Sequence, residues 1–116
     1  MKSDNVYIGI ILDAIRKIGD FTVGTNKEEF FNNEMRRSAV IMQLVVIGEE
    51  SNKIKEETKS KIDLQWREIL DFRNMAVHEY MELDLGIVWG TVQKDIPELK
   101  AKLLEYINGR DGVVAV

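Results

Sequence analysis

Apolar residues recur at helical spacing along almost the whole chain, and this pattern constrains the fold more than any other feature. Residues three and four apart lie on one face of a helix, whereas a half-buried strand needs strict alternation, which is rare here. The chain has one proline, Pro97, and no glycine- or serine-rich linker. Its 116 residues suffice for one domain with its own core. We therefore expect a single all-α domain over residues 1–116, with residues 109–116 as a loose tail.

The pattern predicts an up-and-down bundle of four main helices with one additional short helix. The first main helix covers about residues 5–19, with Asp4 as its N-cap, and the second covers about residues 34–56. Between them, residues 25–29 hold two overlapping pairs of a capping residue and a glutamate, which are typical of a helix start. These pairs are Thr25 with Glu28 and Asn26 with Glu29. The short helix is expected to begin there.

Two further helices are expected after a loop at residues 58–63. Asp63 is the predicted N-cap of the third helix, and the fourth begins near Asp84. The apolar stripe of the fourth helix keeps its phase through Pro97, which lacks the N–H that would bond the carbonyl of Gln93. We therefore expect one helix kinked at its proline rather than two helices.

The composition excludes several kinds of site. The chain has no cysteine, which excludes a disulfide framework and a cysteine nucleophile, and its one histidine excludes a multi-histidine metal site within one chain. We expect no metal and no cofactor. The longest charge-free apolar stretch, residues 38–48, is about half the length that a membrane-spanning helix needs. With a net charge of −4 and no cleavage site after its first apolar run, the chain is expected to be cytoplasmic, with no membrane partner.

Residues 71–80, Asp-Phe-Arg-Asn-Met-Ala-Val-His-Glu-Tyr, depart from this simple pattern. Arg73 occupies a position on the apolar stripe where a leucine would be expected, and Asn74, His78 and Tyr80 follow within two turns. On an ideal helix, Arg73 and Tyr80 lie about 20° apart, whereas Arg73 and His78 lie about 140° apart. The head groups of Arg73 and His78 can therefore meet only through the long arginine side chain, a frayed turn or a second copy of the helix.

Composition and spacing leave two interpretations of this segment open. In the first, Arg73 pairs with a carboxylate inside the bundle, and His78 and Tyr80 form local hydrogen bonds near a helix end. In the second, the guanidinium binds a phosphate and stabilises a phosphorane, while the imidazole transfers protons at the ribose 2′-OH and the leaving 5′-oxygen. Such a pair would cleave RNA without a metal, and DNA, which lacks the 2′-OH, would resist.

The segment Arg73-Asn74-x-x-x-His78-x-Tyr80 resembles the Arg-x4-His-x-Tyr motif of the HepT-like branch of the HEPN superfamily, whose members are helical-bundle ribonucleases. The similarity covers essentially the whole chain in order. It includes Val46-Ile47-Gly48-Glu49-Glu50, Trp66-Arg67-Glu68-Ile69, Leu83-Asp84-Leu85-Gly86-Ile87-Val88-Trp89 and Ile96-Pro97-Glu98-Leu99. One departure is Asp71-Phe72, where relatives often carry a glycine and an aliphatic residue. An extra carboxylate there could pair with Arg73 or Arg67.

The resemblance implies the toxin of a toxin–antitoxin pair. It implies a homodimer in which two copies of the motif line one cleft and cleave RNA, with Arg73 and His78 as the catalytic pair and Asn74 in a supporting polar role. The implied partner is an MntA-type nucleotidyltransferase antitoxin, which would silence the nuclease by adding AMP to Tyr80. Two alternatives stay open: a catalytically weak HEPN dimer that serves as regulatory partner and AMP acceptor of the nucleotidyltransferase, and a plain interaction bundle.

Two further features have paired interpretations. A basic stretch at one end of the bundle could follow an RNA backbone, or it could be a solvated face, because Glu56 and Glu57 interrupt it. It consists of Lys53, Lys55, Lys59, Lys61 and Arg67. Glu49 and Glu50 could orient Arg73, or they could be surface or capping residues. Trp66 is assigned to packing in the core or a dimer rather than to base stacking.

Overall fold

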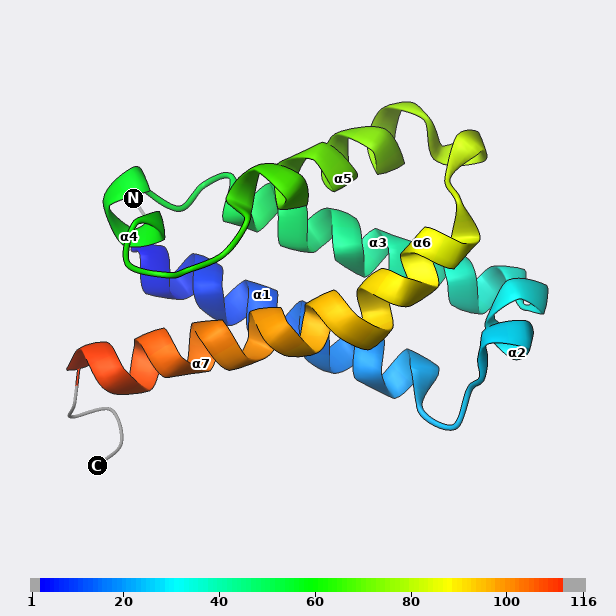
Figure 1. The fold of residues 1–116 in the computed structure, drawn as a ribbon, viewed down its shortest axis with the longest axis horizontal. Helices are drawn as coiled ribbons and strands as arrows, with labels where there is room; N and C mark the ends of the chain where they lie inside the picture. The colour runs from blue at the N-terminus through cyan, green and yellow to red at the C-terminus, as the bar shows by residue number, and fades with distance from the viewer. Residues whose placement is uncertain (1–2, 112–116) are drawn as a thin grey trace.

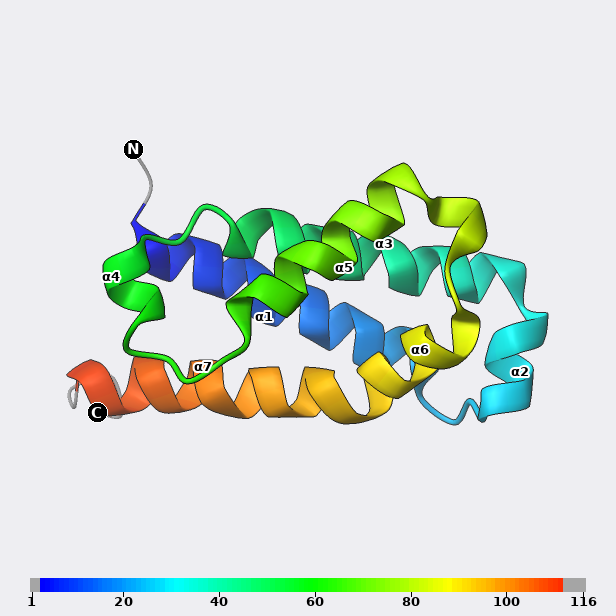
Figure 2. The same ribbon diagram turned by 45° about the horizontal axis from the view of Figure 1, so that its top comes forward.

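A computed structural model describes residues 3–111, and every regular element in that range is helical (Figure 1). The elements are α1 (Asp4–Thr22), α2 (Lys27–Asn32), α3 (Glu34–Ser51), α4 (Glu56–Lys59), α5 (Trp66–His78), the 3-10 turn η1 (Tyr80–Glu82), α6 (Leu85–Gly90), the π-helical segment η2 (Thr91–Asp95) and α7 (Ile96–Asp111). The long rods α1, α3, α5 and α6–α7 alternate in direction (Figures 1 and 2). The predicted all-α up-and-down architecture is confirmed. No described helix is long and apolar enough to cross a membrane.

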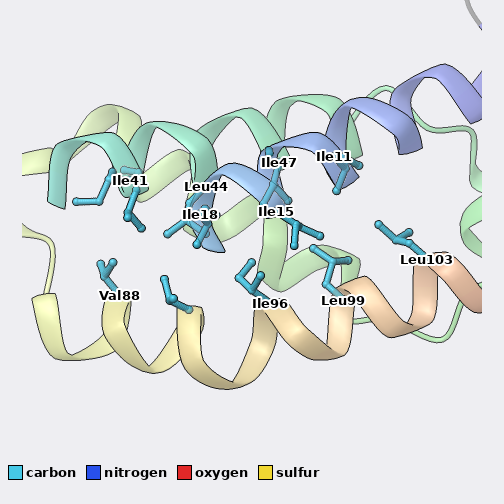
Figure 3. Packing of buried hydrophobic residues seen from close by; sticks show 14 of the residues in the cluster. Ile11, Ile15, Ile18, Ile41, Leu44, Ile47, Val88, Ile96, Leu99 and Leu103 are labelled. Carbon is cyan, nitrogen blue, oxygen red and sulfur yellow. The ribbon is translucent and has the colours of Figure 1, made fainter. Parts of the chain in front are cut away.

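The core lies between α1, α3 and the closing rod α6–α7 (Figure 3). Each contributes one apolar stripe whose members are at most 7% exposed. The labelled members are Ile11, Ile15 and Ile18 of α1, Ile41, Leu44 and Ile47 of α3, and Val88, Ile96, Leu99 and Leu103 of the closing rod. Since α1 packs along α3, and α3 also packs along α5, the second long helix is the scaffold on which α5 rests.

Two of the predicted helix starts are confirmed by their caps. The Asn26 side chain accepts a hydrogen bond from the Glu29 N–H at 2.8 Å, and the Glu29 carboxylate accepts one from the Asn26 N–H at 3.1 Å, which completes a capping box for α2. The Asp84 carboxylate accepts from the N–H groups of Gly86 and Ile87, so α6 begins where it was expected.

The predictions for Asp4 and for the end of the second helix were wrong. Ser3 is the N-cap of α1, and the Asp4 carboxylate accepts a hydrogen bond from Thr58 Oγ1 at 2.6 Å, which ties α1 to α4. The helix α3 ends at Ser51 rather than near residue 56. The chain turns there because Ile54, only 3% exposed, has to fold back over the end of the bundle.

The predicted cap at Asp63 was also wrong. The helix α5 begins at Trp66, and no side chain caps it at Gln65. The Trp66 indole Nε1–H instead points to the carbonyls of Lys59 and Ile62, at 3.2 and 3.3 Å, so the loop closes on the indole. Asp63 lies 3.8 Å from the ammonium of Lys102.

The closing rod is irregular just before Pro97, where a kink was expected. The Ile96 N–H donates to the Thr91 carbonyl five residues earlier, which defines the π-helical segment η2. The extra residue in this turn accommodates a proline that cannot bond the Gln93 carbonyl. The helix α7 continues to Asp111, so the predicted loose tail is helical over residues 109–111, and residues 112–116 lie outside the described range.

Candidate active site

The site begins with a close approach of α3 and α5 at Gly48. A Cβ built on Gly48 would lie 2.3 Å from Cβ and 2.7 Å from Cγ of Arg73, so only a glycine lets the two helices meet at this distance. Those Arg73 atoms are at the base of its side chain and cannot swing away. The absence of a side chain at Gly48 therefore makes room for the Cβ and Cγ of Arg73 between the two helices.

Polar groups of the same chain fix the Arg73 guanidinium at this crossing. Its Nη2 donates to Glu49 Oε1 at 2.8 Å, and its Nη1 donates to Asn74 Oδ1 at 2.6 Å. The Nε is buried and has no hydrogen-bond partner in the part of the chain that the structure describes. The Arg73 side chain is 24% exposed and the Glu49 side chain 45%, so the guanidinium lies at the surface with its stem covered. The predicted pairing of Arg73 with a carboxylate is thus present, and that carboxylate belongs to Glu49.

The neighbouring acids have other partners. Asp71, which could have paired with either arginine, accepts from Arg67 Nε at 3.1 Å. Glu50 pairs with Lys53 at 3.1 Å through one oxygen, while its other oxygen is buried without a partner among the described residues. Of the two glutamates that could orient Arg73, Glu49 does so.

His78 is the last residue of α5, and it is exposed. Since α5 is a regular α-helix from Arg73 to His78, the two side chains keep their separation around the helix axis, and one chain does not bring them together. Within residues 3–111 the imidazole has no hydrogen-bond or ion-pair partner, which leaves it open to a ligand.

Tyr80 lies beyond α5, in the 3-10 turn η1, and not on the helix as the apolar pattern suggested. Glu79 leaves the helical backbone conformation, with φ of −135° and ψ of 43°, which ends α5. The Tyr80 hydroxyl lies 3.2 Å from the Ser38 hydroxyl near the start of α3. The phenol is therefore held against α3, but it stays 44% exposed.

An exposed apolar strip, formed by Met42 of α3 and Val77 of α5, lies between these polar groups. The contacts Glu49–Arg73 and Ser38–Tyr80 show that α3 and α5 run in opposite directions, so Met42 and Val77 fall in the interval between them. Met42 is 57% exposed and Val77 is 48% exposed. Exposed apolar side chains beside polar groups are typical of surfaces that contact another macromolecule.

Sequence reasoning singled out Arg73, Asn74, His78 and Tyr80, and the structure places all four on α5 or directly after it. It missed the steric role of Gly48 and the contact made by Ser38. Gly48 carried a signal, since a glycine inside an apolar helical run often marks a close approach of two backbones. Ser38 carried none, because its contact with Tyr80 spans 42 residues of sequence.

The chain matches the family described as Ribonuclease HepT-like over residues 11–106. It is 35% identical over 102 residues to "Probable ribonuclease HepT" of Thermococcus cleftensis, which covers 87% of this chain and 93% of that protein. It is 34% identical over 94 residues to a "Putative RNase" of Methanocaldococcus jannaschii, which covers 80% of this chain and 86% of the relative. The chain belongs to the HepT-like ribonuclease family.

A third relative is longer than this chain. It is the Methanocaldococcus jannaschii protein named "Gamma-glutamylcyclotransferase and putative RNase", 31% identical over 111 residues, which covers 95% of this chain but 50% of that protein. This chain therefore spans half the length of that relative. No solved structure gives a significant match. The family membership confirms the resemblance that the Arg-x4-His-x-Tyr motif indicated.

Proposed function

We propose that this HepT-like chain is a metal-independent endoribonuclease toxin that acts as a homodimer. Arg73 binds and stabilises the scissile phosphate, His78 transfers protons, and Asn74 supports the guanidinium. The observation that carries the proposal is the fixed guanidinium at the crossing of α3 and α5, with an open imidazole five residues later in the same helix.

The geometry of Arg73 suits a phosphate ligand. Glu49 and Asn74 each use one N–H of the terminal nitrogens, and a guanidinium has further N–H groups on those nitrogens that can donate to phosphate oxygens. A pre-positioned donor of this kind stabilises charge that develops during the reaction without having to reorganise.

The reaction breaks one bond and forms one. The 2′-oxygen of the ribose attacks phosphorus, and the bond from phosphorus to the 5′-oxygen breaks. The products are a 2′,3′-cyclic phosphate and a free 5′-hydroxyl. The imidazole of His78 accepts the proton of the 2′-OH, and the resulting imidazolium returns a proton to the leaving 5′-oxygen, so each site uses one His78.

A second copy of the chain would overcome the separation between the Arg73 and His78 side chains of one chain. Because Arg73 and His78 of one chain point in different directions, a two-fold axis near the strip of Met42 and Val77 would bring the arginine of one copy toward the histidine of the other. The exposure of that apolar strip supports an interface there.

Regulation is proposed at Tyr80. A nucleotidyltransferase of the MntA type would bind ATP, the phenolic oxygen would lose its proton and attack the α-phosphorus, and the bond to pyrophosphate would break, so that pyrophosphate leaves. The added phosphate would compete for Arg73 and repel RNA. The exposure of the Tyr80 ring at the edge of the site supports this role. The same exposure favours the second candidate function, a weakly catalytic dimer that is mainly an AMP acceptor.

The test is incubation of the purified, unmodified protein with RNA in the presence of a chelator. Fragments ending in 2′,3′-cyclic phosphate are expected, with no cleavage of DNA of the same sequence. Arg73→Ala and His78→Ala should each abolish cleavage, while Arg16→Ala, a change at an exposed arginine of α1, should not.

The outcome decides between the two candidate functions. Intact RNA with a well-folded wild-type protein would contradict the nuclease and leave the AMP acceptor. Mass spectrometry of protein co-expressed with the nucleotidyltransferase then tests Tyr80: AMP should be found on the wild type and be absent from Tyr80→Phe.

A further inference from the structure

A hollow of about 340 Å³ lies beside the Arg73 site, between α3, α4 and α5. Its size is at the low end of the range for small-ligand sites. Its walls carry Gly48, Ser51 and Asn52 from the end of α3, Glu56 and Lys59 from α4, and Trp66, Arg67 and Leu70 from α5. The proposed catalytic chemistry uses none of these polar side chains.

One wall of the hollow holds a polar group without a partner. Ser51 is only 3% exposed, and its Oγ is buried with no hydrogen bond. A buried hydroxyl without a partner among residues 3–111 loses its hydration without compensation, so a ligand that bonds it would recover that loss. Asn52 follows it, and its exposed side-chain amide both donates and accepts.

Two cations line the same hollow. Lys59 lies 5.6 Å over the Trp66 ring and 3.7 Å from the carboxylate of Glu56, and Arg67 pairs with Asp71 at 3.1 Å. The carboxylates of Glu56 and Asp71 are exposed, and ion pairs at exposed positions contribute little free energy. Both cations can therefore exchange these partners for a phosphate.

The hollow continues the Arg73 site along the same two helices. Gly48 belongs to both, because it lines the hollow and contacts the base of Arg73. Along α5, Arg67 precedes Arg73 by six residues, about 9 Å of helix rise. Because six residues also turn the helix by about 240°, a strand whose phosphate is bound at Arg73 would have to curve around α5 to enter the hollow.

We propose that this hollow is a ribonucleotide subsite for the residue next to the scissile link. Arg67 and Lys59 bind its phosphate, and Ser51 and Asn52 bond the sugar hydroxyl or the base edge. The choice of RNA as the ligand of this subsite rests on the proposed nuclease function. In this proposal, Lys59 and Arg67 are the residues of the basic stretch that bind RNA.

Trp66 provides a direct signal for binding, because its ring lines the hollow. Trp89 is the second tryptophan of the chain and packs 5.2 Å from the ring of Phe30, and Trp89→Phe leaves Trp66 as the single tryptophan. In a Trp89→Phe, His78→Ala protein, which should bind RNA without cutting it, a short RNA oligonucleotide should change the Trp66 emission in a saturable way.

Arg67→Gln and Arg16→Gln form a matched pair for the binding experiment. Both arginines are exposed and both pair with an aspartate of their own helix, so neither change should disturb the fold. Arg67→Gln should weaken RNA binding about tenfold, as expected for the loss of one charge-assisted contact. It should also lower the slope of log Kd against log salt by about 0.7, whereas Arg16→Gln should change neither.

The possible outcomes separate the subsite from the nuclease. The subsite is overturned and the nuclease stands if fluorescence anisotropy shows binding of labelled RNA while the Trp66 emission stays constant. The same conclusion follows if Arg67→Gln binds RNA as tightly as Arg16→Gln does. If the emission and the Arg67→Gln effect appear while the wild-type protein cuts no RNA, the subsite stands and the nuclease fails. Absence of any RNA binding overturns both.

Discussion

The missing side chain of Gly48 is what allows Arg73 to lie between α3 and α5. Gly48→Ala would place a methyl group within 2.3 Å of the arginine Cβ, so the two helices must separate. We expect a loss of about 1–3 kcal/mol of unfolding free energy, as for other overpacked contacts, together with loss of cleavage.

Gly9→Ala in α1 is the control for this change. Nothing lies within 4 Å of a Cβ at Gly9, and alanine is the better helix former, so this variant should be more stable by about 0.5–1 kcal/mol. Urea unfolding measures both variants. Equal behaviour of the two alanines would contradict the close approach at Gly48.

Glu49 is expected to act as a positioning residue, because it contacts Arg73 and not the reacting atoms. Glu49→Ala should lower kcat about tenfold to a hundredfold with little change in KM, since a small displacement of the guanidinium weakens stabilisation of the transition state. Glu49→Gln keeps a hydrogen-bond acceptor and should retain most of the activity. A purely structural role predicts instead a loss of stability with kcat unchanged in the folded fraction.

The motif could be recognised from the sequence, because Arg73 interrupts an apolar stripe and a family motif surrounds it. The partner of Arg73 could only be narrowed to Glu49, Glu50 and Asp71, since the choice depends on how α3 and α5 are rotated against each other. The placement of Tyr80 outside α5 was also beyond reach, because the end of that helix is set at Glu79 by its backbone conformation and not by a proline or glycine.

Among the elements, helix ends were predictable where the capping groups are local. Asn26 with Glu29 and Asp84 with Gly86 are contacts within three residues, and sequence alone finds them. The start of α5 depends instead on where the Trp66 indole finds its acceptors, and the end of α3 depends on burial of Ile54. Such contacts depend on tertiary packing, which a propensity argument does not contain.

Two aspartates test this distinction with the same substitution. Asp84→Ala removes the cap of α6 and should lower the unfolding free energy by about 1 kcal/mol. Asp63→Ala removes a side chain that caps nothing and is 96% exposed, so its effect should stay within about 0.5 kcal/mol. Chemical denaturation of both variants measures the difference, and an equal loss would show that Asp63 also stabilises α5.

At the scale of the whole molecule, the all-α architecture followed from periodicity, while the assembly of the site did not. The regular helix from Arg73 to His78 holds the two side chains on different faces, and no local change short of unwinding α5 alters that. The proposed catalytic pair would therefore need a second copy, and the exposed apolar strip at Met42 and Val77 is where such a copy would bury surface. In that proposal the pair would consist of one residue from each subunit.

Mixed dimers test this arrangement. In the proposed dimer, each site takes Arg73 from one chain and His78 from the other. When one chain carries Arg73→Ala and its partner carries His78→Ala, one site lacks both residues and the other site holds both. Co-expression of the two variants should therefore restore about a quarter of wild-type cleavage, because about half of randomly paired dimers are mixed and each holds one intact site. Each variant alone should be inactive, and so should two separately purified variants mixed without subunit exchange. Absence of restored cleavage in isolated mixed dimers would mean that Arg73 and His78 act within one chain, which would require α5 to unwind at its last turn.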